Sequence, residues 1–157
     1  MSLPQLTLQT NPVELHLRVE FRFEKYKKIT FYEDCVKKIL VVDDQVSVRR
    51  LIEMTLVGKG LEVIQADSGE QAVVQARADA PDLVIMDVMM PGGMDGYATI
   101  AALRDLSCDC PVLILTGKDQ QSERDRARVA GGDAYLPKPF RLHELLEVVE
   151  SLLGGTA

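Results

Sequence analysis

From residue 39 onward, two kinds of hydrophobic pattern alternate along the chain. Five continuous apolar runs of strand length lie near residues 39–43, 61–66, 82–87, 111–116 and 133–136. Each run is followed by a segment whose apolar residues recur every three or four positions, which is the period of a helix packed on one face. Continuous apolar runs are typical of parallel strands buried on both faces. The pattern predicts five β-α units that form one parallel sheet, covered by helices on both sides through right-handed crossovers.

Two of the predicted helices have a clear apolar face. The face of the first contains Val48, Leu51, Ile52, Thr55 and Leu56. That of the last contains Leu142, Leu145, Leu146, Val149 and Leu153. The second helix is expected to begin with a capping box, in which Ser68 is the N-cap and Gln71 the third helical residue.

The fourth predicted helix, near residues 120–130, has few apolar residues. Only Ala127, Val129 and Ala130 are available for burial. Because apolar burial stabilises by about 25 cal/mol per Å², a helix with so little of it is expected to be held loosely. A weakly anchored element is a candidate for a moving part.

Reactive side chains stand at or just after the ends of four of the five strand runs. Asp43 and Asp44 end the first, Asp87 the third and Thr116 the fourth, and Lys138 closely follows the fifth. In an open parallel sheet the carboxyl ends of the strands share one edge, where ligands bind at the topological switch point. These five side chains are therefore predicted to form a pocket for a divalent cation and a phosphoryl group.

Composition and charge narrow the function classes. The 157 residues are 46% hydrophobic and 5% aromatic, which suits one aliphatic α/β domain with a short extension. No apolar run of about 20 residues and no signal peptide is present, and three cysteines without framework spacing fit a reduced, cytoplasmic protein. Residues 39–157 carry eleven basic against nineteen acidic side chains. Such a domain repels phosphate backbones, so the predicted partners are proteins and not nucleic acid or membrane.

Residues 38–153 resemble the receiver domain of two-component response regulators. The resemblance rests on the acid pair 43–44, Asp87 within the segment 86–91, Met94-Asp-Gly96, Thr116, Tyr135 and Lys138-Pro-Phe140. It implies a flavodoxin-like (βα)5 three-layer sandwich with parallel strand order 2-1-3-4-5. The chain then divides into an N-terminal extension (1–37), a receiver domain (38–153) and a short tail (154–157).

The resemblance also implies a metal site and a phospho-acceptor. Asp87 is expected to take a phosphoryl group from a phosphohistidine and hold it as an acyl phosphate. Mg²⁺ is expected to be bound directly by Asp44, Asp87 and the backbone carbonyl of Met89, and by Asp43 through water. The chemistry agrees, because adjacent carboxylates repel one another unless a cation intervenes, and Mg²⁺ prefers oxygen ligands.

Lys138 and Thr116 are expected to bind the phosphoryl oxygens, and the Lys138–Pro139 bond is expected to be cis, as in the family. Tyr135 occupies the position of the family's switch aromatic, whose ring turns inward as Thr116 moves toward the phosphoryl group. A tyrosine that is simply half-buried in the core is the alternative, and it stays open.

Three features depart from the common family pattern or adjust it. Gly92-Gly93 adds one residue to the loop after the phospho-acceptor, and glycine is expected to absorb it. Met89 and Lys118 occupy positions that are expected to restrict attack by water, which predicts a phosphorylated state lasting at least minutes. The pair Cys108-Asp-Cys110 has the spacing of half a metal site, but an ordinary loop is favoured because two further ligands are missing.

The expected function is that of a single-domain response regulator, since no output domain follows Ala157. It would receive its phosphoryl group from a histidine kinase or histidine phosphotransfer protein. It would signal to a downstream protein through the face formed by the fourth helix, fifth strand and fifth helix, as a monomer or a weak phosphorylation-dependent dimer. Self-phosphorylation from small donors and self-dephosphorylation are the only catalysis expected. Whether it is a diffusible switch or a phosphorelay intermediate stays open.

Two other function classes compete with this interpretation. One is a docking module that works without phosphorylation, although such proteins usually lack the acid pair, the acceptor or the lysine. The other is an aspartyl phosphatase of the haloacid dehalogenase type, which needs a second acid two residues after its nucleophile. Met89 occupies that position, so this alternative is disfavoured.

The N-terminal extension has its own pattern. Residues 13–23 alternate apolar and polar, which is typical of an amphipathic strand, and residues 29–32 are suited to pair with it as a hairpin. An alternative start of the protein near Val36 would leave residues 1–35 unmade. Both interpretations stay open.

Overall fold

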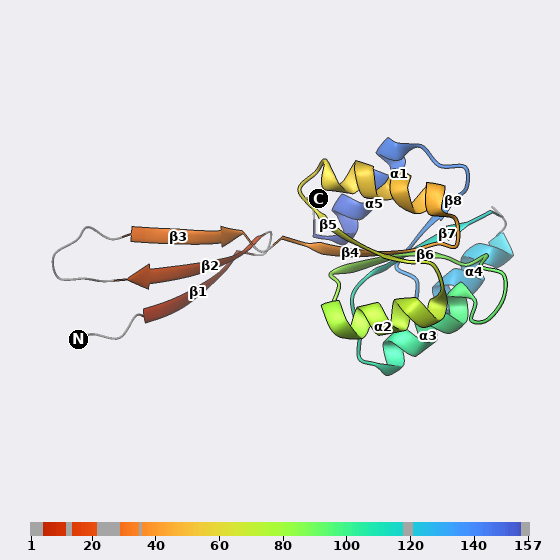
Figure 1. The fold of residues 1–157 in the computed structure, drawn as a ribbon, viewed down its shortest axis with the longest axis horizontal. Coiled ribbons are helices and arrows are strands. Elements are labelled where there is room, and N and C mark those ends of the chain that lie inside the picture. The colour runs from red at the N-terminus through yellow and green to blue at the C-terminus, as the bar shows by residue number, and fades with distance from the viewer. Residues whose placement is uncertain (1–4, 12–13, 22–28, 35, 118–120, 155–157) are drawn as a thin grey trace. The chain divides into compact units, whose positions relative to one another are not determined.

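A computed structural model describes residues 5–11, 14–21, 29–34, 36–117 and 121–154 of the chain. The chain separates into a small N-terminal unit, which ends at Val36, and a larger unit, which begins at Lys37. Figure 1 shows a β-hairpin sheet in the first unit and an α/β sandwich in the second.

The N-terminal unit is an antiparallel sheet of three strands in the order β1-β2-β3. The strands are β1 (Gln5–Asn11), β2 (Glu14–Phe21) and β3 (Ile29–Asp34). Strands β2 and β3 lie in the segments discussed as a hairpin, and they pair from His16 opposite Asp34 to Phe21 opposite Ile29. Strand β1 falls outside those segments, so the sheet has one strand more than the sequence pattern indicated.

The larger unit contains a parallel sheet of five strands in the order β5-β4-β6-β7-β8. The strands are β4 (Lys38–Val42), β5 (Glu62–Ala66), β6 (Leu83–Asp87), β7 (Val112–Thr116) and β8 (Ala134–Pro137). Numbered within this unit, the order is 2-1-3-4-5, which confirms the predicted flavodoxin-like topology. Strand β4 therefore lies beside β6, and their carboxyl ends meet at the switch point.

Helices cover both faces of this sheet (Figure 1). On one face lie α1 (Val46–Val57) and α5 (Leu142–Leu152). On the other lie α2 (Gly69–Asp79), α3 (Gly96–Asp105) and α4 (Gln121–Val129). Among the described residues, no helix is both long enough and apolar enough to cross a bilayer.

The core forms two layers because successive strand residues point to opposite faces. In β4, Leu40 and Val42 pack beneath α2 and α3, whereas Ile39 and Val41 pack beneath α1 and α5, and all four are fully buried. The other central strands alternate in the same way. This two-sided burial explains why the strands appear in the sequence as unbroken apolar runs.

Some predicted core positions are wrong. In α1, Ile52 and Leu56 are buried, but Leu51 is 46% exposed, because the buried stripe is centred on the other two. In α4, Ala127 is buried and Val129 is 85% exposed. Residues that are two positions apart in a helix point to nearly opposite sides, so Val129 faces solvent when Ala127 faces the sheet. The prediction that α4 contributes little to the core is confirmed.

The predicted cap of α2 has a modified form. The Ser68 hydroxyl accepts a hydrogen bond from the Gln71 backbone N–H, as a capping box requires. The Gln71 side chain, however, accepts from the N–H of Asp67 at 2.7 Å and not from that of Ser68. The reciprocal bond has moved back by one residue, and it still satisfies a donor at the helix start.

Candidate functional site

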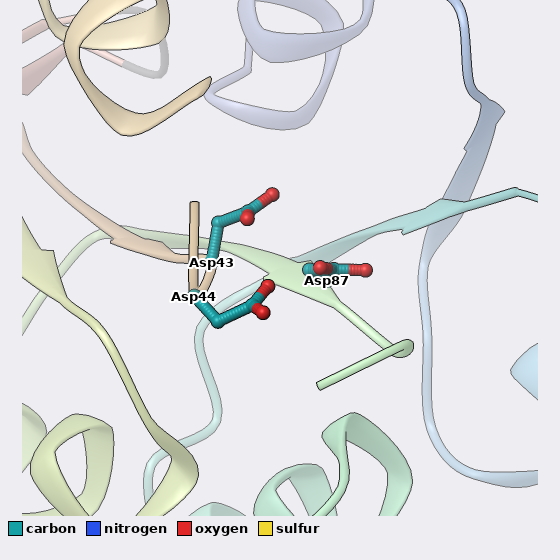
Figure 2. A group of neighbouring side chains, drawn as sticks. All are labelled: Asp43, Asp44 and Asp87. Carbon is teal, nitrogen blue, oxygen red and sulfur yellow. The ribbon is translucent and has the colours of Figure 1, made fainter. Parts of the chain in front are cut away.

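Three carboxylates meet at the carboxyl ends of β4 and β6. Asp43 and Asp44 directly follow β4, and Asp87 is the last residue of β6 (Figure 2). Each of the three offers an oxygen within 4.8 Å of the others. Asp43 and Asp87 are buried, with 0% and 2% exposure, and Asp44 is exposed. The cluster thus has a buried floor and one acid at the surface.

The two buried acids are held by backbone groups of the loops that follow them. Asp43 Oδ1 accepts from the N–H of Gln45 at 2.8 Å, and Asp87 Oδ1 accepts from the N–H of Met89 at 3.0 Å. The Arg49 guanidinium donates to the backbone carbonyl of Asp43 at 2.7 Å. Each carboxylate is therefore fixed on one side by its own loop and presents its second oxygen to the pocket.

Lys138 brings a cation to those second oxygens. Its Nζ lies 2.8 Å from Asp43 Oδ2 and 3.4 Å from Asp87 Oδ2. The Lys138–Pro139 peptide bond is cis, as predicted, and the Lys138 N–H donates to the carbonyl of Thr116 at 2.6 Å. The sheet edge and the lysine backbone are thus joined directly.

The pocket is short of positive charge. Burial, together with the charge of Asp43, raises the pKa of Asp87 above its usual value, against the lowering effects of the Met89 N–H and Lys138. Burial by itself would lower the pKa of Lys138, but the hydrogen bond and charge of Asp43, with those of Asp87, raise it. One ammonium group does not balance three carboxylates, so a further cation would be bound favourably.

Thr116 and Tyr135 lie on the neighbouring strands. Thr116 ends β7, is 1% exposed, and stands opposite Pro137 of β8. Tyr135 of β8 is partly buried against the core beneath α2 and α3, and the Arg124 guanidinium of α4 lies 5.5 Å from its ring centroid. The three acids therefore offer oxygens within 4.8 Å of one another, and Lys138 contacts Asp43 and Asp87. Thr116 shares their sheet edge, and Tyr135 faces toward α4.

The loop after Asp87 absorbs its additional glycine through left-handed backbone conformations. Gly92 and Gly93 have φ of 75° and 65°, which residues with a side chain rarely adopt. Glu70 of α2 accepts a hydrogen bond from the N–H of Met94 at 3.0 Å and so ties this loop to the helix. Met89 is 58% exposed. Lys118, the second position expected to affect water access, lies outside the described residues.

Gly96 and Glu70 have structural roles that the sequence did not reveal. A Cβ at Gly96 would lie 2.5 Å from the Asp87 carbonyl oxygen and 2.6 Å from Val88 Cα, so only glycine lets α3 begin this close to the end of β6. Gly96 belongs to the segment Met94-Asp-Gly96, which carries part of the family resemblance, but the sequence did not indicate its close packing against β6. Glu70 gave no signal, because its partner Met94 is 24 positions away in sequence.

Comparison with known proteins decides what this pocket belongs to. Residues 39–150 match the family model described as the response regulator receiver domain. The chain belongs to this family. The receiver domain is 44% identical over 119 residues to the response regulator MprA of Mycolicibacterium vanbaalenii, a match that covers 76% of this chain and 51% of MprA. The chain thus spans about half the length of the curated relatives it matches.

Solved structures give the same fold. The chemotaxis protein CheY4 of Vibrio cholerae aligns with a TM-score of 0.72 at 32% identity, over 75% of this chain and 99% of CheY4. A response regulator from Chloroflexus aurantiacus aligns with a TM-score of 0.70 at 38% identity, over 75% of this chain and 98% of its own. Both alignments support the predicted fold of the receiver domain.

The donor set of this receiver domain fits Mg²⁺. Receiver domains generally bind this ion at an acidic pocket, and three carboxylates supply the hard oxygen ligands it prefers. Across the described part of the chain, the acid cluster is the one group of three or more His, Cys, Asp or Glu side chains close enough to share an ion. Within those residues, Cys108 and Cys110 are not part of such a group.

Proposed function

We propose that this receiver domain accepts a phosphoryl group on Asp87 from the phosphohistidine of a histidine kinase or phosphotransfer protein. The observation that carries the proposal is the position of Lys138 Nζ, 3.4 Å from Asp87 Oδ2, at a pocket that also contains Asp43 and Asp44. A cation beside a buried carboxylate, with two more acids in reach, is an arrangement for receiving a group that is itself anionic.

In the proposed reaction, an Asp87 carboxylate oxygen attacks the phosphorus of the donor. The new O–P bond forms as the P–N bond breaks, and the electron pair of that bond stays with the histidine ring. Lys138 donates N–H groups to the phosphoryl oxygens, and the buried Asp43 keeps its ammonium in place through the 2.8 Å contact. Thr116, at the same sheet edge, donates its hydroxyl to a further phosphoryl oxygen.

Magnesium, when bound, neutralises charge on the carboxylates and on the transferring group. Asp44, Asp87 and the Met89 carbonyl are the proposed direct ligands, with Asp43 acting through water. The hydrogen bonds support this division. Asp43 is the most fully engaged acid, since Gln45 and Lys138 each donate to one of its oxygens at 2.8 Å, whereas Lys138 lies 3.4 Å from Asp87 Oδ2. Asp44 is exposed and accepts no hydrogen bond from the described part of the chain.

We propose that the face formed by α4, β8 and α5 is the surface through which the receiver domain contacts a downstream protein. A phosphoryl group adds close to two negative charges and three acceptor oxygens. Lys138 and Thr116, at the ends of β8 and β7, would respond to them, and Tyr135 would transmit the shift to α4. Support comes from α4, which buries only Ala127 among its described residues and holds Arg124 beside the Tyr135 ring.

The chemical nature of the product tests this function. Purified protein is incubated with labelled acetyl phosphate and Mg²⁺, and the labelled product is then treated with hydroxylamine. An acyl phosphate on Asp87 is cleaved by this nucleophile, so the label is lost, and chelation of Mg²⁺ beforehand prevents labelling. A label that resists hydroxylamine, or that forms equally in the presence of a chelator, would rule out the proposed chemistry.

A further inference from the structure

Two thiols lie side by side in the loop between α3 and β7. The Sγ atoms of Cys108 and Cys110 are 3.3 Å apart, and only Asp109 separates the two residues. Both cysteines are free and partly exposed. Since the sulfurs of a disulfide lie about 2.0 Å apart, roughly 1 Å of approach would join them.

We propose that Cys108 and Cys110 are a redox modification site that forms a reversible disulfide. The pair precedes β7, whereas Thr116 ends it, so the thiols and the acidic pocket are at opposite ends of the same strand. Oxidation is therefore independent of the chemistry proposed for Asp87.

The surroundings assign different roles to the two sulfurs. Burial, followed by the hydrogen bond and charge of Cys108, raises the pKa of Cys110 to about 12, against a smaller lowering by Arg104. The raised pKa disfavours the Cys110 thiolate, and either sulfur can donate the hydrogen that lies between the two. The first attack on an oxidant is assigned to Cys108, because the thiolate and not the thiol is the nucleophile and burial disfavours the thiolate of Cys110.

The oxidant is a small disulfide, and the exchange is balanced. The Cys108 thiolate attacks one sulfur of the oxidant, so a mixed S–S bond forms and one thiolate leaves. Cys110 then gives up its proton to the solvent or to that leaving thiolate and attacks Cys108 Sγ. The mixed bond breaks, the second thiolate of the oxidant leaves, and the Cys108–Cys110 bond remains. In total, two protein thiols are oxidised and one small disulfide is reduced to two thiols.

The loop is accessible to such a molecule. A surface hollow of about 360 Å³ lies between the end of α2 and this loop. Both cysteines line it, together with Arg77, Ala80, Pro81 and Leu106. A small disulfide can therefore reach the sulfurs without opening the core, and Arg77 supplies a cation for a carboxylate-bearing one.

Arg104 connects the dithiol loop to the end of α4. Its guanidinium donates to the carbonyls of Cys108 at 2.8 Å and Cys110 at 2.7 Å, and also to the carbonyl of Gly131 at 3.0 Å. Gly131 lies in the turn between α4 and β8. Closing a ring across Asp109 reorients the two loop carbonyls, so Arg104 must shift its hold on that turn. The modification is therefore expected to loosen the turn after α4.

The test uses the full chain with Cys35→Ser, because Cys35 lies outside the described residues and in a different tryptic peptide. The protein is incubated with oxidised glutathione, and the remaining thiols are alkylated under denaturing conditions. After digestion with trypsin, mass spectrometry gives the mass of the peptide from Asp105 to Lys118. The expected peptide carries no alkyl group, is lighter by two hydrogens, and becomes alkylated twice after treatment with dithiothreitol. Two alkylated cysteines after oxidation, or a disulfide between two chains, would overturn the proposal.

Single variants and hydrogen exchange separate the parts of the inference. In Cys110→Ser the reaction should end at the mixed disulfide between Cys108 and one glutathione, because no second thiol can resolve it. This mixed disulfide should form faster than the one on Cys110 in Cys108→Ser. The reverse order would contradict the assigned roles. In the oxidised protein, backbone amides of residues 127–133 should exchange severalfold faster, while those of β6 stay unchanged. Unchanged exchange in residues 127–133 would show that Arg104 does not transmit the modification.

Discussion

Lys138 forms its shortest ion pair with Asp43, at 2.8 Å, and lies farther from Asp87, at 3.4 Å. Asp43 is fully buried and Lys138 is 24% exposed. The lysine is thus held at the pocket before any phosphoryl group arrives, by an acid that is not itself the acceptor. This relationship makes Asp43 a positioning residue for the cation as well as a member of the acid cluster.

Removing the ammonium group should destabilise the protein. Lys138→Met leaves Asp43 buried without its cation, and we expect the free energy of unfolding in a chelator to fall by about 1–3 kcal/mol. Urea denaturation measures it. Lys37→Met is the control, because its pair with Asp82 spans 3.8 Å between side chains about 40% exposed, and exposed pairs contribute little. Equal stability of the two variants would contradict the structural role of the Lys138–Asp43 pair.

Magnesium should stabilise the protein through Asp44. At a concentration about 100 times its dissociation constant, a bound ion adds about 2.7 kcal/mol to the free energy of unfolding, which thermal unfolding detects as a higher Tm. Asp44→Asn should lose this shift and, without Mg²⁺, unfold at a higher temperature than the parent, because carboxylate repulsion is relieved. Asp67→Asn, at the end of β5 and outside the cluster, should keep the shift. A full Mg²⁺ shift in Asp44→Asn would remove this residue from the ligand set.

Gly96 should be irreplaceable in a way that Gly58 is not. In Gly96→Ala, the new Cβ meets backbone atoms of Asp87 and Val88 at 2.5 and 2.6 Å. We expect a loss of about 1–3 kcal/mol in the free energy of unfolding, together with slower phosphorylation, since the acceptor strand must move. Gly58→Ala, at φ −60° with its nearest atoms at 3.5 Å, should be neutral or slightly stabilising. Equal effects on stability would refute the close-packing argument.

Tyr97 ties α3 to α4, and this tie should depend on pH. Its hydroxyl donates to Glu123 at 3.1 Å, and Arg126 lies 4.5 Å from its ring centroid. Burial, then the hydrogen bond and charge of Glu123, raise the pKa of Tyr97 to about 12. An unfolded tyrosine has a pKa near 10. The hydrogen bond from Tyr97 to Glu123 should therefore contribute fully to the free energy of unfolding below about pH 10, and this contribution should be lost as the pH rises toward 12.

Urea denaturation of the parent and of Tyr97→Phe between pH 9 and 12 checks this expectation, in ~1-unit steps. The stability difference between the two proteins should shrink as the pH rises, and α4 amides should exchange faster in Tyr97→Phe at neutral pH. A difference that does not change with pH would mean that the pKa of Tyr97 is the same in the folded and unfolded chains, and that its hydroxyl is not held by Glu123.

The sequence predicted the sheet and the acid cluster well because both follow from local rules. Buried parallel strands are apolar throughout, and residues at their carboxyl ends must share an edge, so Asp43 and Asp87 were brought together by topology alone. The position of Lys138 beside Asp43, however, joins residues 95 positions apart. Its distance depends on how β8 and the following loop pack, which no local pattern records.

The misassigned positions have similar physical causes. Leu51 and Val129 are apolar and lie in helices, yet they are exposed, because the direction of a helix face is set by what packs against it. The sequence also suggested that α4 is held only by its few apolar residues. The contacts of Glu123 and Arg126 with Tyr97 show that polar groups provide a second attachment.

Intact-mass spectrometry can show whether Asp87 accepts a phosphoryl group. The protein and its Asp87→Asn variant are incubated in parallel with acetyl phosphate and Mg²⁺, and the mass of each intact protein is measured. We expect the parent to gain the mass of one phosphoryl group and the variant to gain none. An equal gain in both proteins would place the phosphoryl group on a residue other than Asp87. No gain in either protein would contradict the proposal that this receiver domain is phosphorylated.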